Sequence, residues 1–71
     1  MKVGDLVIDH TDNEIGLVVA TGLGIYVDGA RYPDGLMPSW KVDWPSTHGR
    51  LVDIGEDCLL DGTVEVISEA R

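Results

Sequence analysis

The residues with the most chemical potential in this chain are its two histidines, its one cysteine and its serines. Catalysis would need a nucleophile beside a base, or carboxylates placed around a cleft. His10 and His48 fall in predicted turns, no serine lies in a Gly-x-Ser-x-Gly motif, and Cys58 has no recognisable motif around it. A chain of 71 residues also encloses little concave volume for a substrate. We therefore predict a protein that is not an enzyme and holds no cofactor.

The acidic residues Asp9, Asp12 and Glu14 could supply oxygen ligands to calcium if the loop between them brings them together. Their spacing lacks the alternating acids and the central glycine of an EF-hand loop. Turn formation at Asp12 and Asn13 explains the same residues without a metal. Cys58 is the only cysteine, so an internal disulfide and a cysteine-based zinc site are both excluded. We predict no metal site and a reducing compartment.

The net charge restricts the class of partner. Thirteen acidic against five basic side chains give a formal charge of -8, which repels phosphate backbones. We therefore expect no nucleic-acid partner. A basic protein partner is compatible with this charge, although solubility alone also explains it. The basic residues form no stripe and are scattered as Lys2, Arg31, Lys41, Arg50 and Arg71.

The apolar stretches are too short for membrane insertion. The opening MKVGDLVID lacks the apolar region of a signal peptide, and no run approaches the roughly 20 apolar residues of a membrane span. We expect no membrane contact, and a protein that is intracellular or carried in a particle.

The apolar residues come in short runs separated by glycine, proline and aspartate, which is typical of strands joined by tight turns. We expect one all-β domain over residues 1–71. Its first strand is predicted at Leu6–Asp9. The continuous apolar run Ile15–Thr21 predicts a second strand that is buried on both faces. A core this small gives modest stability, so docking on a partner or homo-oligomerisation is expected.

Residues 22–36 predict an added hairpin after the second strand. The pair Asp28-Gly29 lies between the apolar runs Ile25–Val27 and Ala30–Tyr32, which is the arrangement of a two-residue hairpin turn. A second pair, Asp34-Gly35, follows a proline and predicts the turn that returns the chain to the main sheet.

The clearest strand is predicted at residues 38–44, where side chains alternate between two faces. One face carries Pro38, Trp40, Val42 and Trp44, and the other carries Ser39, Lys41 and Asp43. After it we expect a turn over residues 45–49, a strand over 50–54, a short helical turn over 55–60 and a closing strand over 64–68. Five strands with a helical turn before the last match the order of an SH3-like barrel. The predicted fold is therefore an all-β, five-stranded SH3-like barrel with an added hairpin.

The segments KVGDLV, EIGLVVATG, WKVDWP, RLVDIGEDCLL and VEVIS resemble the small SH3-like barrel proteins that tailed bacteriophages encode. In that group a Lys-x-Gly-Asp-Leu-Val opening precedes a Gly-x-Val-Val strand, a Val-x-Trp strand and a closing Val-Ile-Ser. Here these motifs fall on residues 2–7, 16–19, 42–44 and 66–68. Similar openings occur in KOW-type domains of ribosome-linked and transcription-linked proteins. An RNA-associated module is thus a further alternative, which the net charge disfavours.

The resemblance implies a non-catalytic phage structural protein, such as a capsid decoration, cement or connector protein that docks on a larger assembly. Its location would be the virion or the cytoplasm of the host cell. The alternative is an intracellular acidic adaptor that binds a basic host or phage protein, with its charge raising the encounter rate. Binding of that kind should weaken strongly with salt, whereas apolar docking should not.

The predicted protein-binding site is the added hairpin, over residues 25–37, together with an exposed strand edge, which would otherwise invite uncontrolled pairing. The apolar side chains of the hairpin stay exposed unless they fold over the main sheet or meet a partner. Tyrosine is also frequent in binding hot spots. Trp40 and Trp44 could join the two tyrosines in an acidic and aromatic surface. However, both tryptophans are on the face of their predicted strand that points inward, which favours a position in the core. The residues predicted to contact a partner protein are Ile25, Tyr26, Val27, Arg31, Tyr32 and Met37.

Overall fold

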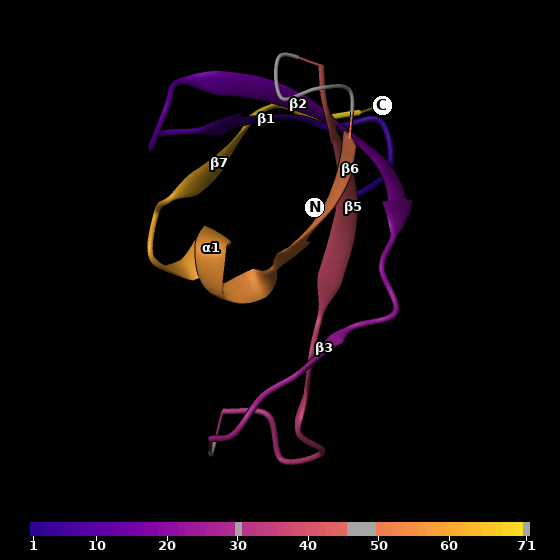
Figure 1. The fold of residues 1–71 in the computed structure, drawn as a ribbon, viewed down its shortest axis with the longest axis vertical. Helices are drawn as coiled ribbons and strands as arrows, with labels where there is room; N and C mark the ends of the chain where they lie inside the picture. Colours follow the sequence, from indigo (N-terminus) through magenta and orange to yellow (C-terminus); the bar gives the residue numbers. More distant parts are fainter. Residues whose placement is uncertain (30, 46–49, 71) are drawn as a thin grey trace.

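The computed structural model describes residues 1–29, 31–45 and 50–70. The protein is mostly β, with a single short helix in these residues (Figure 1). The elements follow in the order β1 Leu6–Asp9, β2 Glu14–Thr21, β3 Ile25–Tyr26, β4 Leu36–Met37, β5 Ser39–Trp44, β6 Arg50–Gly55, α1 Glu56–Leu60 and β7 Val64–Ser68. The predicted all-β class is therefore confirmed. The predicted turn over residues 45–49, with His48, lies almost wholly outside the described residues.

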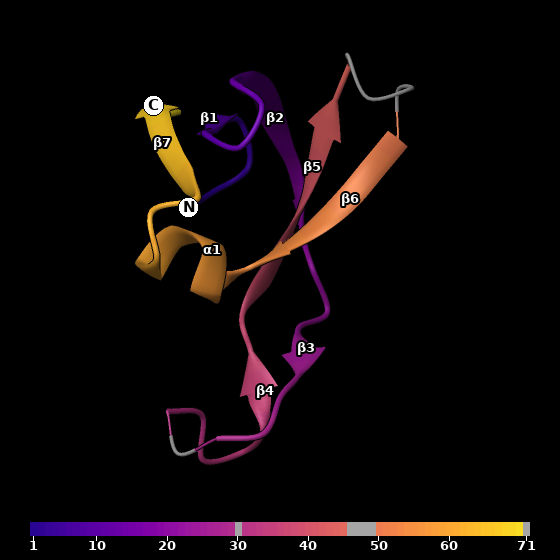
Figure 2. The ribbon, with the colours of Figure 1, turned by 60° about the vertical axis from the view of Figure 1, so that its left-hand side comes forward.

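Five strands form one antiparallel sheet in the order β6-β5-β2-β1-β7. The last strand of the chain thus pairs with the first. The sheet curls, and α1 carries the chain from β6 to β7 across the open side (Figures 1 and 2). Over the described residues no strand ladder joins β6 to β7, so the closed barrel expected from the sequence is not formed.

The core lies on the concave face of the sheet. Val18 and Val42 are opposite each other in the β2–β5 ladder, and both are fully buried. Gly16 lies beneath Trp44, where a Cβ atom would overlap the indole ring. The buried cluster is made of Val7, Val18, Val42, Trp44, Ile54 and Val64. Trp40 is half-buried against this cluster, as its parity with Trp44 predicts.

The outer face of β2 corrects one prediction. Ile15 and Leu17 are exposed, whereas Gly16 and Val18 are buried. No second layer of the described chain covers the convex side of the sheet, so the strand is buried on one face and not on both. The apolar run alone could not reveal this, because a strand whose apolar side chains face solvent on one side has the same sequence pattern as a strand that is buried on both sides.

The start of β5 departs from the strict alternation predicted for residues 38–44. Pro38 is exposed and precedes the strand, while Ser39 is buried. The Ser39 hydroxyl accepts a 3.0 Å hydrogen bond from the Gly24 amide, so the hairpin covers it. The β2–β5 register also shifts between Val18 and Ala20, which breaks the alternation at this end of the ladder.

The added hairpin is present, but its turn differs from the prediction. β3 pairs with β4 in a separate two-stranded sheet. The chain reverses at Tyr32–Gly35, where the Gly35 amide donates a 2.7 Å bond to the Tyr32 carbonyl, and not at Asp28-Gly29. Pro33 suits the second position of this turn, and Gly35 adopts a φ of 73° that favours glycine. The Val27 amide then bonds the Gly35 carbonyl at 2.9 Å and closes the hairpin.

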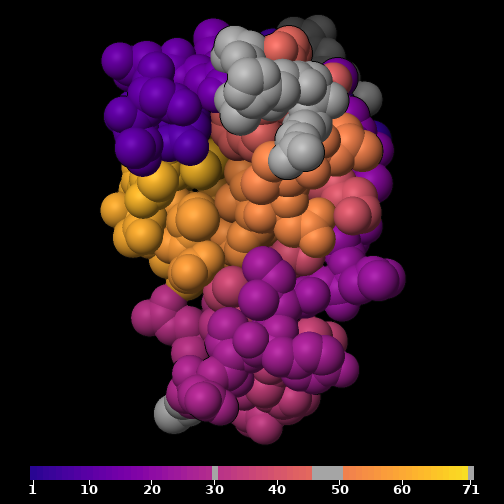
Figure 3. Space-filling model, viewed as in Figure 1, coloured from indigo at the N-terminus to yellow at the C-terminus, as the bar shows by residue number. Residues whose placement is uncertain are grey.

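The hairpin projects beyond one end of the main sheet (Figure 2). In the space-filling view its residues form a distinct lobe below the strands and the helix (Figure 3). The only described helix has five residues, and no described helix is long and apolar enough to cross a membrane.

Candidate docking site

The most exposed apolar side chains of the protein lie on the hairpin and on the segment that leads into it. Leu23 is 94% exposed and Tyr26 is 85% exposed. Ile25 and Val27, which flank Tyr26, are half-buried. Since neighbouring strand residues point to opposite faces, this pattern places Ile25 and Val27 toward the body of the protein and Tyr26 toward solvent.

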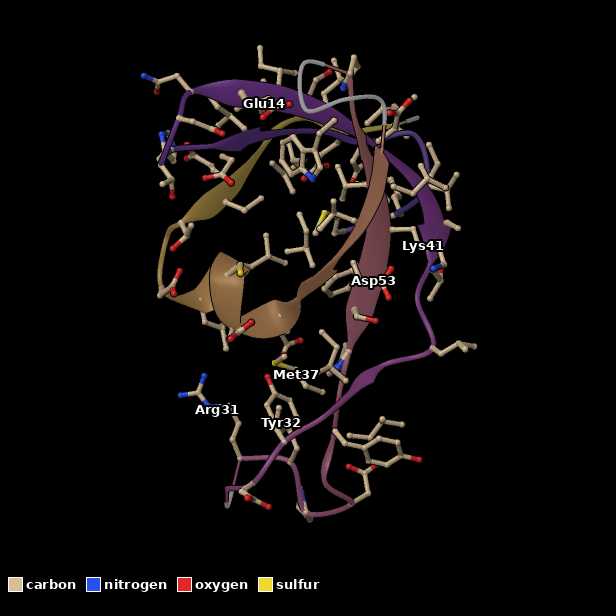
Figure 4. The ribbon with its side chains drawn as sticks, in the orientation of Figure 1. Glu14, Arg31, Tyr32, Met37, Lys41 and Asp53 are labelled. Carbon is tan, nitrogen blue, oxygen red and sulfur yellow. The ribbon has the colours of Figure 1, made fainter. Side chains whose placement is uncertain are left out.

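Tyr32 is attached to the body of the protein. Its hydroxyl donates a 2.6 Å hydrogen bond to Glu56 Oε1, at the start of α1. Figure 4 shows its ring rising from the hairpin turn toward the helix. The carboxylate acceptor, with a smaller contribution from burial, raises the pKa of the Tyr32 phenol above its ordinary value. The two tyrosines that the sequence grouped together therefore play different structural roles.

Met37 is a core contact and not a surface residue. It is 4% exposed and packs against Gly55, where an added Cβ atom would overlap the Met37 methyl group. Figure 4 places it between the hairpin and the main sheet. The prediction that Met37 contacts a partner is thus at odds with its burial. Its side chain instead joins β4 to the end of β6.

Arg31 is exposed beside Tyr32, near the outer end of the hairpin (Figure 4). Lys41 differs from it, because the Lys41 ammonium lies 3.2 Å from Asp53 Oδ1 across the β5–β6 ladder. Arg31 therefore brings a cation to the exposed surface of the hairpin.

An apolar hollow of about 180 Å³ lies where the hairpin joins the sheet. Its lining includes Leu23, Leu36, Pro38 and Trp40. The Gly22 amide donates a 2.9 Å bond to the Ser39 carbonyl, which fixes the chain at the edge of this hollow. Leu23 and the hollow together continue the exposed apolar surface from Tyr26 toward the main sheet.

The chemistry-bearing residues are not assembled into a reactive site in the described ranges. His10 Nε2 lies 3.0 Å from Glu65 Oε1 in an exposed pair. Burial, with Asp57 and Asp61 nearby, raises the pKa of the Cys58 thiol, which disfavours the reactive thiolate. Over the same residues no three His, Cys, Asp or Glu side chains are grouped so that they could hold a metal ion. Asp12 Oδ1 instead accepts a 3.2 Å hydrogen bond from the Glu14 amide, which is the role expected of an aspartate in a turn.

Comparisons with protein-family models, with curated proteins and with solved structures find no match for this chain. The resemblance to phage barrel proteins therefore stays a prediction.

Sequence reasoning missed Leu23 and the partner of Tyr32. The signal for Leu23 is present in the sequence, because an apolar residue between two glycines has few neighbours to bury it. No local signal identifies Glu56, which lies 24 residues from Tyr32 in the chain and meets it only after folding.

Proposed function

We propose that this protein is a non-catalytic docking module with an SH3-like architecture, which attaches to a larger protein assembly through its hairpin. The SH3-like assignment is supported by the strand order β6-β5-β2-β1-β7 and by the short helix before the last strand. In this proposal the gap between β6 and β7 is the open side of an incomplete barrel.

The observation that carries the docking function is the exposure of Tyr26 and Leu23 on an element that is held to the body. Exposed apolar side chains are common singly, but here an exposed tyrosine and an exposed leucine lie on one projecting segment, and tyrosine is frequent in binding hot spots. The Tyr32 hydrogen bond and the Met37 contact limit the freedom of the hairpin. Less conformational entropy is therefore lost when a partner binds.

The assembly proposed is a bacteriophage particle, with the protein as a capsid decoration, cement or connector component. The motifs at residues 2–7, 16–19, 42–44 and 66–68 support this choice. The protein would then be found in the virion, or in the host cytoplasm before assembly. Contact through Tyr26 and Leu23 is mainly apolar, so attachment should persist at high salt.

The test is quantitative mass spectrometry of this chain across a size-fractionated phage preparation or native lysate. We expect enrichment in particle fractions at a fixed ratio to a capsid or tail protein, and loss of that enrichment in Tyr26→Ala. Ile15→Ala is the matched control, because it also truncates an exposed apolar side chain but on the sheet. Retention of Tyr26→Ala in the particles would contradict the hairpin as the docking site.

The second candidate is a soluble acidic adaptor for a basic protein, supported by the net charge of -8. Elution of the chain with a single soluble basic protein, in a complex that dissociates as salt is raised, would favour this function over the first.

A further inference from the structure

Val52 is an inward-facing residue that the described chain leaves uncovered. It lies opposite Val42 in the β5–β6 ladder, so both side chains are on the concave face. Val42 is completely buried, whereas Val52 is 42% exposed. The difference arises because β6 is an edge strand of the sheet. On the outer side of β6, no described strand covers the side chain of Val52 or pairs with the free edge.

A groove runs along this edge, between β6 on one side and α1 with β7 on the other. Its volume is about 430 Å³. A second hollow of about 190 Å³ shares three lining residues with it, so the two are continuous. The floor is apolar and is formed by Trp44, Val52, Ile54 and Val64. We call it the β6–α1 groove.

The polar lining of the β6–α1 groove is acidic. Asp9 lies opposite the buried Val64 in the β1–β7 ladder, so it is on the concave face. Glu14 is opposite Asp9 in the β1–β2 ladder, on the same face. Asp12 and Asp57 also line the two hollows, and no lysine or arginine does so in the described part of the chain. Asp53 is different, because its carboxylate meets Lys41 on the opposite face.

We propose that the β6–α1 groove binds an extended segment of a partner protein that carries lysine or arginine two residues away from an apolar residue, so that both side chains point into the groove. The segment lies along β6 as an added strand, with backbone hydrogen bonds to the free edge. Its apolar side chain covers Val52 and Trp44. Its cation meets the carboxylates of Asp9 and Asp57.

The charge of the molecule selects this occupant over a second copy of the chain. A copy would bring another net charge of -8 to an acidic groove, and like charges placed together disfavour binding. β6 has six residues, so a segment of about six residues, at roughly 3.3 Å each, spans its edge. The proposal is independent of Tyr26, which does not line the groove, although Ile25 and Val27 of the hairpin close one end of it.

The probe is a fluorescently labelled hexapeptide, Thr-Leu-Thr-Lys-Thr-Leu, whose leucines and lysine share one face of an extended strand, and binding to the full chain is measured by fluorescence anisotropy at low and moderate salt. We expect Val52→Lys to weaken binding by about tenfold or more, because it places a cation on the groove floor. Leu51→Lys is the matched control. It makes the same charge change one residue away, on the convex face, and should have a much smaller effect.

Two further measurements separate specific binding from attraction to an acidic protein. The same hexapeptide with serine in place of both leucines should bind more weakly, because it keeps the lysine but cannot cover Val52. Amide chemical-shift changes should concentrate on β6 and α1. The proposal is overturned if the leucine peptide does not bind, or if Val52→Lys and Leu51→Lys weaken it equally. Tyr26→Ala should leave peptide binding unchanged, so this result and the hairpin result can be told apart.

Discussion

The Tyr32 hydroxyl and the Glu56 carboxylate are joined by a 2.6 Å hydrogen bond that links the turn of the hairpin to the first residue of α1. Tyr26, six residues earlier, points into solvent. Tyr32 therefore holds the hairpin in place, and Tyr26 is exposed on its surface. Four predictions follow from this arrangement and from the contacts of the main sheet.

Tyr32→Phe should loosen the hairpin without unfolding the sheet, because the ring remains and only the hydrogen bond to Glu56 is lost. Hydrogen exchange is expected to accelerate at the amides of Val27 and Gly35, whose bonds close the hairpin. The Val18 amide, which bonds the Asp5 carbonyl in the sheet, is the internal reference and should be unchanged. Unaltered exchange at Val27 would show that the hairpin holds its place without Tyr32.

Alkaline pH should have a related effect. Because the pKa of Tyr32 is raised in the folded protein, the stability that this phenol contributes is complete below its ordinary pKa of about 10. That stability is lost as pH rises through the higher folded value. In Tyr26→Phe, where Tyr32 is the only tyrosine, the ultraviolet absorbance of tyrosinate should appear above pH 10. A midpoint at or below that of a free tyrosine amide would contradict the role of Glu56.

Asp5 should control the stability of the protein in acid. Its Oδ1 accepts the Ala70 amide at 2.7 Å and its Oδ2 accepts the Lys2 amide at 2.8 Å. These bonds, the first most strongly, lower the pKa of the Asp5 carboxyl. The resulting stability is present above the unfolded pKa of about 4 and is lost as pH falls through the lowered folded value.

Asp5→Asn should therefore lower the melting temperature at neutral pH and reduce its fall between neutral pH and pH 3. Asp28→Asn makes the same charge change at an exposed position of the hairpin and is the control. Equal melting temperatures for the two variants across this range would show that Asp5 does not hold the two ends of the chain.

Gly16→Ala should destabilise the core by about 1–3 kcal/mol, because the added methyl group would overlap Trp44 and Val42. Chemical denaturation followed by tryptophan fluorescence measures the loss. Val42→Ala alone should cost about 2 kcal/mol by leaving a cavity. The double variant should lose less stability than the sum of the two single losses, because the methyl group added at Gly16 partly fills the cavity left at Val42. Strict additivity would mean that Gly16 and Val42 do not compete for the same space.

Much of the main sheet could be predicted from the sequence. The bounds of β1 and β7 are confirmed as Leu6–Asp9 and Val64–Ser68, because turn residues delimit short apolar runs at both places. The helical turn is confirmed at Glu56–Leu60. Local patterns succeed here because strand and turn preferences agree with the final packing.

The errors come from contacts between distant parts of the chain. Asp28-Gly29 has the preferred composition for a two-residue turn, but β3 pairs with β4, and Tyr32 bonds Glu56, only if the chain reverses later. The sequence places Met37 in an exposed hairpin, but its side chain is buried because Gly55 has no side chain and leaves space for it. The β6–α1 groove also escaped prediction, since it depends on the sheet remaining open between two edge strands. The docking role of Tyr26 and Arg31 stays a prediction.

The pairing of β1 with β7 determines how the protein would respond to a pulling force. Leu6, the first residue of β1, lies opposite Ser68, the last residue of β7. Tension applied through the two ends of the chain would therefore separate this ladder one hydrogen bond at a time, beginning with the amides held by Asp5. Strands that are peeled apart in this way resist less than strands that must slide past each other. When both ends of the chain are pulled, this ladder is therefore the first part of the sheet to open.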